Sequence, residues 1–388
     1  MMKTTLIREL NDHLKQVILP YWKGLIDREK GGFYGFVDYD LKTVRNADKG
    51  VILHSRILYF FARAALVYGE DALMEYADHA YDFLTENCLD KENGGVYWMM
   101  TADGRVQDST KHTYNQAFAI YALAAYYEAS DRREALDLAL ELFHLIEEKC
   151  VDPYGYREAF TVDFQPVEND KLSENGLLAD KTMNTLLHLL EAYTLLYRVS
   201  RDEEVEERLK YILDLFYTKV WNPLEGRLEV FFDEKMNSLC DLYSYGHDIE
   251  ASWLIDEAYL ALNLPVPDEY TKNLAVNIYH TALKGDHVLN ECFRGVVDRT
   301  RVWWVQAESM VGFVNLYQKN GAERYLAATW EIWEYIKQYF VDSRSGGEWF
   351  WDLDERNVPS SKKPITEPWK CPYHNGRMIM ELFLRLSI

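Results

Sequence analysis

The feature that most constrains the fold of this chain is a glycine and aromatic motif that returns roughly every 60 to 70 residues along the whole sequence. Each copy predicts a turn followed by a short strand in which aromatic side chains alternate. A self-similar period of this size is typical of a repeat architecture. The six copies are GGFYG from Gly31, GGVYW from Gly94, YGYRE from Tyr154, EGRLEVFFD from Glu225, the degenerate VLNECFRG from Val288 and GGEWFWDLD from Gly346.

Two kinds of helical pattern alternate between these copies. The kind that precedes each motif has one charged face, as in EDALMEYADHAYDFLTENCL and RREALDLALELFHLIEEKC, with apolar residues at i, i+3, i+4 and i+7. The kind that follows each motif is apolar and aromatic on all sides, which is typical of a helix buried all round. Its six copies begin near His54, Lys111, Asp180, Gly246, Arg301 and Tyr373.

Twelve helices of alternating burial predict an all-α fold, an (α/α)6 barrel of outer and inner helices with short β-hairpins in the long loops on one rim. Closure of the ring makes residues 1–388 a single catalytic domain. Connections from outer to inner helices span about 17 to 30 residues, whereas the return connections, such as VYGED and SDRRE, are short. All long loops therefore emerge beside the N-terminal ends of the inner helices, and we expect the functional site on that rim.

Composition excludes several classes of partner. The net charge of -21, from 42 basic and 63 acidic residues, argues against nucleic acid and against an anionic membrane. The first residues lack the apolar core of a signal peptide, and no apolar run approaches the roughly 18 residues of a membrane span. The five cysteines form no C-x-x-C pair, which favours free thiols over a zinc site or disulfides. We expect a cytoplasmic protein, a monomer, with no nucleic-acid or membrane partner.

The first turns of the inner helices carry polar and aromatic side chains, several of them three or four residues apart and so on one helix face. Independent repeats thereby place polar groups at one depth in an otherwise apolar ring, which favours a site there. Such pairs are Asn184 with His188, His247 with Glu250, and Trp304 with Glu308; the other candidates are Arg56, Tyr114, Trp253, Trp369 and His374.

Each candidate also has a purely structural interpretation. His54 and His112 fit caps at the start of an inner helix. His188, within the apolar run NTLLHLLEAY, fits a core histidine satisfied by one partner, and His247 with Glu250 fits a simple surface pair. The tryptophans fit the core.

The same residues suit proton chemistry on a sugar. Histidines with a pKa near neutrality transfer protons, and the parallel helix N-termini add a positive potential that keeps an imidazole neutral and favours an oxyanion. Arg56 suits a developing enediolate oxygen, and Glu250 and Glu308 suit the orientation of a histidine tautomer or the binding of sugar hydroxyls. The sequence has no phosphate-binding glycine loop, no dinucleotide fingerprint and no H-E-x-x-H motif, so we expect no cofactor and no metal.

Five long segments carry a resemblance to a known family. They are ADKGVILHSRILYFF (47–61), DKTMNTLLHLLEAY (180–193), YGHDIEASWL (245–254), WWVQAE (303–308) and EPWKCPYHNGR (367–377). Over its whole length the chain resembles the cellobiose 2-epimerases, within the N-acylglucosamine 2-epimerase superfamily. The resemblance implies cofactor-free epimerisation at C2 of the reducing-end sugar of a β-1,4-linked disaccharide, which converts cellobiose to glucosyl-mannose and lactose to epilactose. It also implies the mechanism, in which the ring opens, the C2 proton leaves, a cis-enediol(ate) forms and a proton returns on the other face.

The resemblance also implies a role for each candidate. His247 and His374 match the two acid/base histidines, His188 matches a histidine that supports ring opening and proton transfer, and Arg56 matches the arginine that contacts the enediolate. Of two adjacent tryptophans we prefer Trp304 as the sugar contact, because it shares a helix face with Glu308. Substrate contacts, or residues directly behind them, are Tyr114, Asn184, Glu250, Trp253, Trp304, Glu308 and Trp369.

Three other functions remain open from the residues. One is an epimerase or an aldose–ketose isomerase for N-acetylglucosamine or mannose on the same fold, although HSRILYFF and Trp369 favour the disaccharide. A second is an inverting glycoside hydrolase, in which Glu250 and Glu308 would stand roughly 6.5–9.5 Å apart across the cleft. The third is a sugar-binding protein without catalysis.

Overall fold

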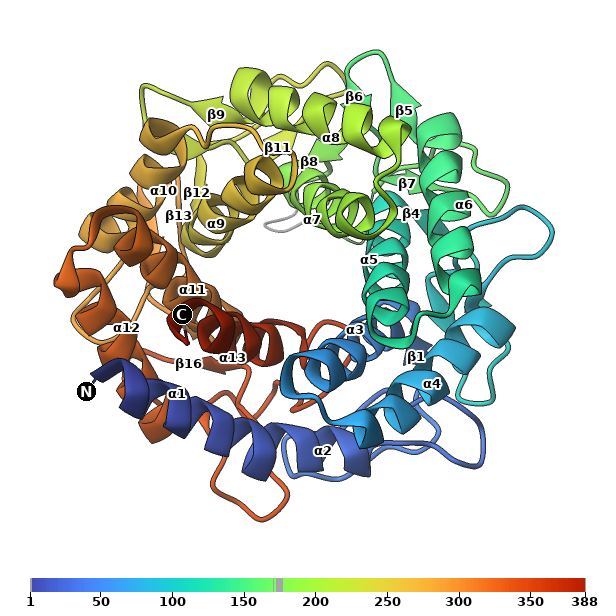
Figure 1. Ribbon diagram of the computed structural model, residues 1–388, viewed down its shortest axis with the longest axis horizontal. Coiled ribbons are helices and arrows are strands. Elements are labelled where there is room, and N and C mark those ends of the chain that lie inside the picture. Colours follow the sequence, from blue (N-terminus) through green and yellow to red (C-terminus); the bar gives the residue numbers. More distant parts are fainter. Residues whose placement is uncertain (1, 170, 172–176, 388) are drawn as a thin grey trace.

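The computed structural model describes residues 2–169, 171 and 177–387 and confirms the predicted barrel. Figure 1 shows the inner helices in a ring around the centre, with the outer helices in a second ring around them. The ring closes because α13 (Tyr373–Leu386) packs against α1 (Met2–His13) and α3 (Val51–Tyr68), which brings the two ends of the chain together. All five cysteines are free thiols, as predicted.

The inner helices are buried along most of their length, which is why their sequences are apolar on all sides. They begin within a few residues of the predicted starts. The first, α3, has the length and apolarity of a membrane span, yet 78% of it is buried inside the protein, as expected of a core helix. The others are α5 (Thr113–Ser130), α7 (Met183–Ser200), α9 (Tyr245–Ala261), α11 (Trp303–Asn320) and α13.

The outer segments bury one face and expose the charged one, as their amphipathic pattern predicts. Within the described residues, four of the six include a five-residue π turn. The six outer segments are α1 with η1 (Leu14–Ile18) and α2 (Leu19–Gly24); η2 (Asp71–Leu73), α4 (Met74–Phe83) and η3 (Leu84–Cys88); α6 (Arg133–Lys149); α8 (Glu203–Leu215) with η4 (Phe216–Val220); α10 (Asp268–Thr281); and α12 (Glu323–Tyr335) with η5 (Ile336–Phe340).

Short antiparallel strands lie in the long loops, and the predicted hairpins account for only some of their pairs. The pairs β2–β3, β5–β6, β9–β10 and β13–β14 are hairpins within one loop. The pairs β1–β2, β4–β7, β8–β11, β12–β13 and β15–β16 instead join the segment before one inner helix to the loop of the next repeat. A bridge between Val37 and Thr366 does the same across the closure of the ring. The loops are therefore joined into one belt around the rim.

The strands that form this belt are two or three residues long. They are β1 (Lys49–Gly50), β2 (Met99–Met100), β3 (Val106–Asp108), β4 (Lys111–His112), β5 (Val151–Asp152), β6 (Gly155–Tyr156), β7 (Ala159–Phe160), β8 (Lys181–Thr182), β9 (Trp221–Asn222), β10 (Arg227–Leu228), β11 (Phe231–Phe232), β12 (Leu242–Ser244), β13 (Glu291–Phe293), β14 (Val296–Asp298), β15 (Arg301–Val302) and β16 (Asp352–Leu353).

Buried lysines hold the loops against the inner helices. Lys49 donates to Oδ2 of Asp27 at 2.7 Å and to the carbonyl of Gly31 at 2.6 Å. Both charged side chains are almost fully buried, so each satisfies a partner that water cannot reach. Equivalent buried pairs are Lys111 with Asp90, Lys181 with Asp152, and Lys370 with Glu348.

Side chains in the first turn of the inner helices hold the motif backbone in the same way. Gln116 accepts from the amide of Val96 at 2.7 Å and donates to its carbonyl at 2.8 Å. Gln306 makes the same two bonds to Val288, at 2.9 and 2.7 Å. These bonds satisfy backbone groups that the turns would leave buried and unpaired. We call the lysine pairs and these helix contacts the loop struts.

The third inner helix has a strut with a carboxyl group. Glu158 accepts from the amide of Thr182 and from Oγ1 of Thr185, each at 2.6 Å, at the start of α7. Burial raises the pKa of Glu158 to about 7, against the lowering effect of these two threonines. This strut fixes the helix that carries Asn184 and His188.

Candidate active site

A cavity of about 250 Å³ lies at the N-terminal ends of the inner helices, on the rim where the long loops emerge. The helix-borne lining residues lie in the first two turns of their helices, and Trp369 lies just before α13. The structure thus brings together nine of the predicted residues, from six repeats. They are Arg56, Tyr114, Asn184, His188, His247, Glu250, Trp304, Trp369 and His374.

Two predicted residues lie behind the cavity wall instead. Trp253 donates through Nε1 to Oε2 of Glu308 at 3.2 Å, and both side chains are buried. Glu308 contacts the lining residue His374, Trp253 lies behind Glu308, and neither side chain lines the cavity itself. Three further residues line the cavity that were not predicted from the sequence. They are Lys171, Trp303 and Trp351. Trp303 and Trp304 both face the cavity, so the choice between them was unnecessary.

Two of the histidines are held at Nδ1 by buried carboxylates. The Nδ1 of His374 lies 2.7 Å from Oε1 of Glu308, and that of His188 lies 3.0 Å from Oε2 of Glu191. Because a carboxylate accepts hydrogen bonds, Nδ1 carries the proton in both rings and Nε2 holds a lone pair. Within the described residues no hydrogen bond reaches either Nε2. Both rings therefore offer a proton acceptor to the cavity.

His247 is held by a group that both donates and accepts. Its Nδ1 lies 2.7 Å from Oγ of Ser244, which is the N-cap residue of α9. A hydroxyl can rotate to suit either tautomer of the ring and also its protonated form. His247 can therefore change protonation state without losing its anchor.

Burial keeps the imidazoles neutral. It lowers the pKa of His247 to about 3, and together with the charge of Arg377 it lowers the pKa of His374 well below the ordinary value. Burial also lowers the pKa of His188, although the hydrogen bond to Glu191 opposes it. The three imidazoles are therefore neutral bases.

Trp304 lies beside both of the predicted acid/base histidines. Its ring centroid is 4.8 Å from that of His247 and 5.4 Å from that of His374. A glycine makes this packing possible, because a Cβ on Gly246 would lie 2.4 Å from Cη2 of Trp304. The glycine before His247 thus lets an aromatic surface reach the space between the two imidazoles.

The positive charge of Arg56 has no carboxylate partner among the residues that the structure describes. Its Nη2 donates to the hydroxyl of Tyr114 at 2.9 Å, and its guanidinium lies 4.2 Å from the ring centroid of Phe118. Within the described residues it forms no ion pair, although its side chain is buried. An unneutralised cation in a cavity wall stabilises negative charge that develops beside it.

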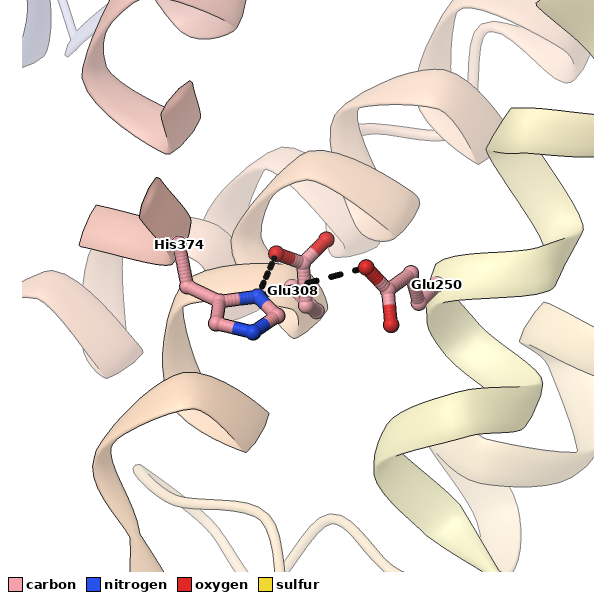
Figure 2. A group of neighbouring side chains, drawn as sticks. All are labelled: Glu250, Glu308 and His374. Carbon is pink, nitrogen blue, oxygen red and sulfur yellow. Dashed lines mark hydrogen bonds and ion pairs between the residues drawn. The ribbon is translucent and has the colours of Figure 1, made fainter. Parts of the chain in front are cut away.

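A second arginine, Arg377, lies behind the histidines and has the opposite surroundings. Its Nη2 lies 2.5 Å from Oε1 of Glu250 and 2.7 Å from Oε1 of Glu308, and its Nη1 donates to Glu191. Figure 2 shows His374 and Glu308 in contact, with Glu250 beyond Glu308. We call Arg377 and its three glutamates the axis cluster.

Glu250, Glu308 and His374 together resemble a metal site, since one ligand atom of each lies within 4.8 Å of the others. The guanidinium of Arg377 already contacts both carboxylates, so the positive charge that they require is supplied by the chain itself. His374 also presents its protonated Nδ1 to them, and a protonated nitrogen does not bind a metal. The donor set therefore does not fit a metal ion.

The three glutamates of the axis cluster hold their protons differently. Burial raises the pKa of Glu191, but Arg377 and His188 outweigh it, so that this pKa falls to about 2. Burial and the charge of Glu308 raise the pKa of Glu250 well above its usual range, against the effect of Arg377. Burial also raises the pKa of Glu308. Glu250 has an Oε2 without a described partner, so we assign it the proton.

Several structural interpretations from the sequence are wrong. His247 and Glu250 are not a surface pair, since both line the cavity and Glu250 is fully buried. His54 is no cap, because its ring accepts from the amide of Phe33 at 2.9 Å and contacts the carbonyl of Gly50. His112 occupies the N-cap position of α5 but its side chain makes no capping hydrogen bond.

Sequence analysis missed Glu191, Tyr373 and Arg377, although all three lie within segments that it quoted. Glu191 follows His188 by three residues and Arg377 follows His374 by three, the spacing that places two side chains on one helix face. Applied to every histidine, this spacing identifies both. Lys171 and Trp351 lie in long loops, where no periodic pattern indicates which way a side chain points.

Comparisons with known proteins show the family of the chain. The sequence profile described as N-acylglucosamine 2-epimerase (GlcNAc 2-epimerase) matches residues 31–375. A cellobiose 2-epimerase of Ruminococcus albus is 49% identical over 99% of both chains, and one of Dictyoglomus turgidum is 45% identical over 97% of this chain and 98% of its own. The solved cellobiose 2-epimerase of Bacillus thermoamylovorans has a TM-score of 0.96 at 45% identity, over 98% of this chain and 100% of that one.

Relatives with other names are more distant. A D-mannose isomerase of Marinomonas mediterranea is 23% identical, over 98% of this chain and 97% of its own, and an N-acylglucosamine 2-epimerase of Rattus norvegicus is 21% identical, over 90% and 84%. A solved D-mannose isomerase has a TM-score of 0.85 at 20% identity, over 97% of both chains, which shows a shared fold alone.

Proposed function

We propose that this chain, which belongs to the N-acylglucosamine 2-epimerase family, inverts C2 of the reducing-end sugar of β-1,4-linked disaccharides. The reactions are cellobiose to glucosyl-mannose and lactose to epilactose. Relatives that are 45% and 49% identical over almost the whole chain bear the name cellobiose 2-epimerase. The observation that carries the proposal is one cavity in which His247 and His374 flank Trp304, and in which Arg56 forms no ion pair with any described residue.

The sugar ring opens first, because a C–H bond next to a carbonyl exists only in the open chain. His188 suits this step, since its Nε2 faces the cavity with a lone pair while Glu191 holds Nδ1. It takes the proton of the anomeric hydroxyl and gives a proton to the ring oxygen. The ring of His188 is held edge-on by Tyr114, with centroids 5.1 Å apart.

Negative charge then develops on the carbonyl oxygen as the C2 proton leaves. Arg56 stabilises this enediolate, because no carboxylate competes for its charge among the described residues. The hydroxyl of Tyr114, which accepts from Arg56, can in turn donate to the same oxygen.

Inversion at C2 requires a base on one face and an acid on the other. We assign these roles to His247 and His374: one takes the C2 proton as a neutral imidazole, and the other is protonated only when the negative charge of the enediolate offsets the effect of burial. The two roles are exchanged in the reverse reaction. Glu308 stabilises the imidazolium of His374 through the 2.7 Å contact at Nδ1. Ser244 serves both states of His247, since its hydroxyl accepts from a protonated Nδ1 and donates to a bare one.

The geometry disfavours the glycoside hydrolase. An inverting hydrolase needs two carboxyl groups roughly 6.5–9.5 Å apart with the glycosidic bond between them. Here Glu250 and Glu308 both contact Nη2 of Arg377, and oxygens of the two carboxylates lie within 4.8 Å of one another. Glu308 is also fully buried, so no substrate reaches it.

Incubation with cellobiose in heavy water tests the proposal. The expected product is glucosyl-mannose that carries deuterium at C2, without any added cofactor. A ketose without the epimer would select the aldose–ketose isomerase, and free glucose would select the hydrolase. Sugar binding without turnover would select the non-catalytic protein. We propose that the enzyme acts as a monomer, which size-exclusion chromatography with light scattering checks in the same preparation.

A further inference from the structure

A second cavity lies at the opposite end of the barrel from the substrate cavity. It has a volume of about 50 Å³ and is lined by inner-helix residues that include Tyr121, Glu191 and Leu195. The charged side chains of Arg198 and Glu257 also line it and are 38% and 22% exposed, so the cavity reaches solvent. A polar cavity of this size has room for a few water molecules. We call it the far cavity.

A single layer of side chains separates the two cavities. His188 lines the substrate cavity, Glu191 lines the far cavity, and the hydrogen bond of 3.0 Å between Nδ1 and Oε2 joins them. Trp253 also lines the far cavity and donates to Glu308, which holds His374. Glu191 and Glu308, which hold His188 and His374, thus connect the substrate cavity with the far cavity, Glu191 directly and Glu308 through Trp253.

The other contacts of Glu191 fix which oxygen faces His188. The hydroxyl of Tyr373 donates to Oε2, and Arg377 donates to Oε1. The carboxylate therefore cannot rotate, and Oε2 is held where it accepts the Nδ1 proton. This arrangement keeps the lone pair of His188 on Nε2, the atom that faces the substrate cavity.

We propose that Glu191 is the positioning residue of His188, and that the far cavity lets this pair exchange hydrogen with bulk water while a sugar fills the substrate cavity. The inference rests on the proposed function. As Nε2 takes a proton from the sugar hydroxyl, the ring becomes an imidazolium, and Oε2 of Glu191 accepts from its Nδ1–H. The hydrogen on Nδ1 exchanges through Glu191 with water in the far cavity. The ring is neutral again once Nε2 has given its proton to the ring oxygen of the sugar.

Chemical rescue of Glu191→Ala tests the proposal. The fold should tolerate this change, because Arg377 keeps Glu250 and Glu308 as partners at 2.5 and 2.7 Å. We expect kcat to fall by about 10²-fold with little change in KM, since the lost group does not touch the sugar. Sodium formate should restore kcat, and its apparent affinity should be the same at saturating cellobiose, because it enters from the far cavity.

Two matched variants identify the route that formate takes. Leu195→Trp fills the far cavity, whereas Leu195→Met leaves the volume of the far cavity nearly unchanged. In the Glu191→Ala background, formate should rescue the Leu195→Met protein and not the Leu195→Trp protein. Rescue that cellobiose inhibits competitively would mean entry through the substrate cavity and would overturn the proposal. So would an absence of rescue, or near-normal activity of Glu191→Ala.

A measurement without turnover separates this inference from the proposed function. In protein labelled with 15N at histidine and free of sugar, we expect the ring of His188 to be the Nδ1–H tautomer. Glu191→Gln, which keeps the shape of the side chain, should give a mixture of tautomers because an amide both donates and accepts. An Nε2–H tautomer in the unaltered protein overturns the positioning role, whatever reaction the enzyme catalyses.

Discussion

Two sets of buried charges lie close together in this barrel, and they are balanced differently. In the loop struts each lysine meets a carboxylate, as Lys49 meets Asp27 with both side chains at most 1% exposed. In the axis cluster one arginine, Arg377, contacts three glutamates, whereas Arg56 forms an ion pair with none of the described carboxylates.

The difference separates stability from chemistry. A buried pair that is matched and hydrogen-bonded holds two segments together, and removal of one partner leaves an uncompensated charge. An unmatched set lowers stability unless a ligand or a reaction supplies the missing charge. The excess of carboxylates around Arg377 suits imidazolium ions that form during turnover, and the bare charge of Arg56 suits an enediolate. Two classes of variant should therefore behave oppositely.

The largest effect is expected at the histidines on the substrate side of the axis cluster. His374→Asn and His247→Asn should each lower kcat by about 10²–10⁴-fold, because each removes the acid or base for one face of C2. The midpoint of thermal unfolding should stay close to that of the unaltered protein, since Asn375 and Arg377 retain the contacts that hold α13. Epimer formation is measured by chromatography, and near-normal turnover in either variant would remove that histidine from the acid/base pair.

The opposite pattern is expected for a loop strut. Lys111→Met leaves the carboxylate of Asp90 buried without its cation, and should lower the free energy of unfolding by about 3–5 kcal/mol. The kcat of the folded fraction should stay within about twofold, because the strut lies behind the loop. Urea denaturation and steady-state kinetics measure the two quantities.

The double variant Lys111→Met with Asp90→Asn provides the matched control. It removes both charges, and should recover at least half of the lost stability. If the single variant is as stable as the unaltered protein, the strut does not hold the loop. If kcat falls with stability intact, the contrast between struts and axis cluster is wrong.

Sequence patterns were sufficient for the barrel because helix periodicity and repeat length are local signals. The start of α13 at Tyr373 was predicted to the residue, and that of α9 to within one residue. The belt of strands was predicted only in part, because pairs such as β4 with β7 join two repeats and no single loop encodes them. Pairing between distant segments is a property of the closed ring.

The site was predictable where a residue lines the cavity from a helix, and less so behind it. His188 and His374 stand at helix positions that the repeats align, so their convergence could be inferred. Of their partners, Glu308 was selected as a group suited to orient a histidine, whereas Glu191 was not. Whether such a buried carboxylate also meets an arginine depends on contacts across 69 residues of sequence for Glu308 and 186 for Glu191. The buried position of Lys49 was not predicted either, because a lysine in a loop is ordinarily exposed.

A smaller effect, in stability alone, is expected at the carboxyl strut of α7. The pKa of Glu158 in the folded protein is about 7, above the ordinary 4.5, so the folded state binds more protons than the unfolded state between these values. The contribution of Glu158 to stability should therefore be fully present below about pH 4.5. The free energy of unfolding should fall by up to about 3 kcal/mol as the pH rises from there past 7. Glu158→Gln should remove this part of the pH dependence, because Gln accepts from Thr182 without a charge. Denaturation at pH 5 and pH 8 measures it, and an unchanged slope in the variant would contradict the assignment.

The smallest effect is expected for Glu250 in the axis cluster. It tests which glutamate of the cluster carries the negative charge. Glu250 has the pKa raised well above its usual range by burial and by Glu308, and its Oε2 has no described partner. Glu250→Gln therefore replaces a neutral carboxylic acid by a neutral amide of the same shape, and should lower kcat/KM by less than about tenfold. Glu308→Gln removes a charge that the imidazolium of His374 requires, and should cost more. The kcat/KM of both variants is measured with cellobiose. If the two variants lose equal activity, Glu250 is ionised and the two carboxylates share the negative charge of the cluster.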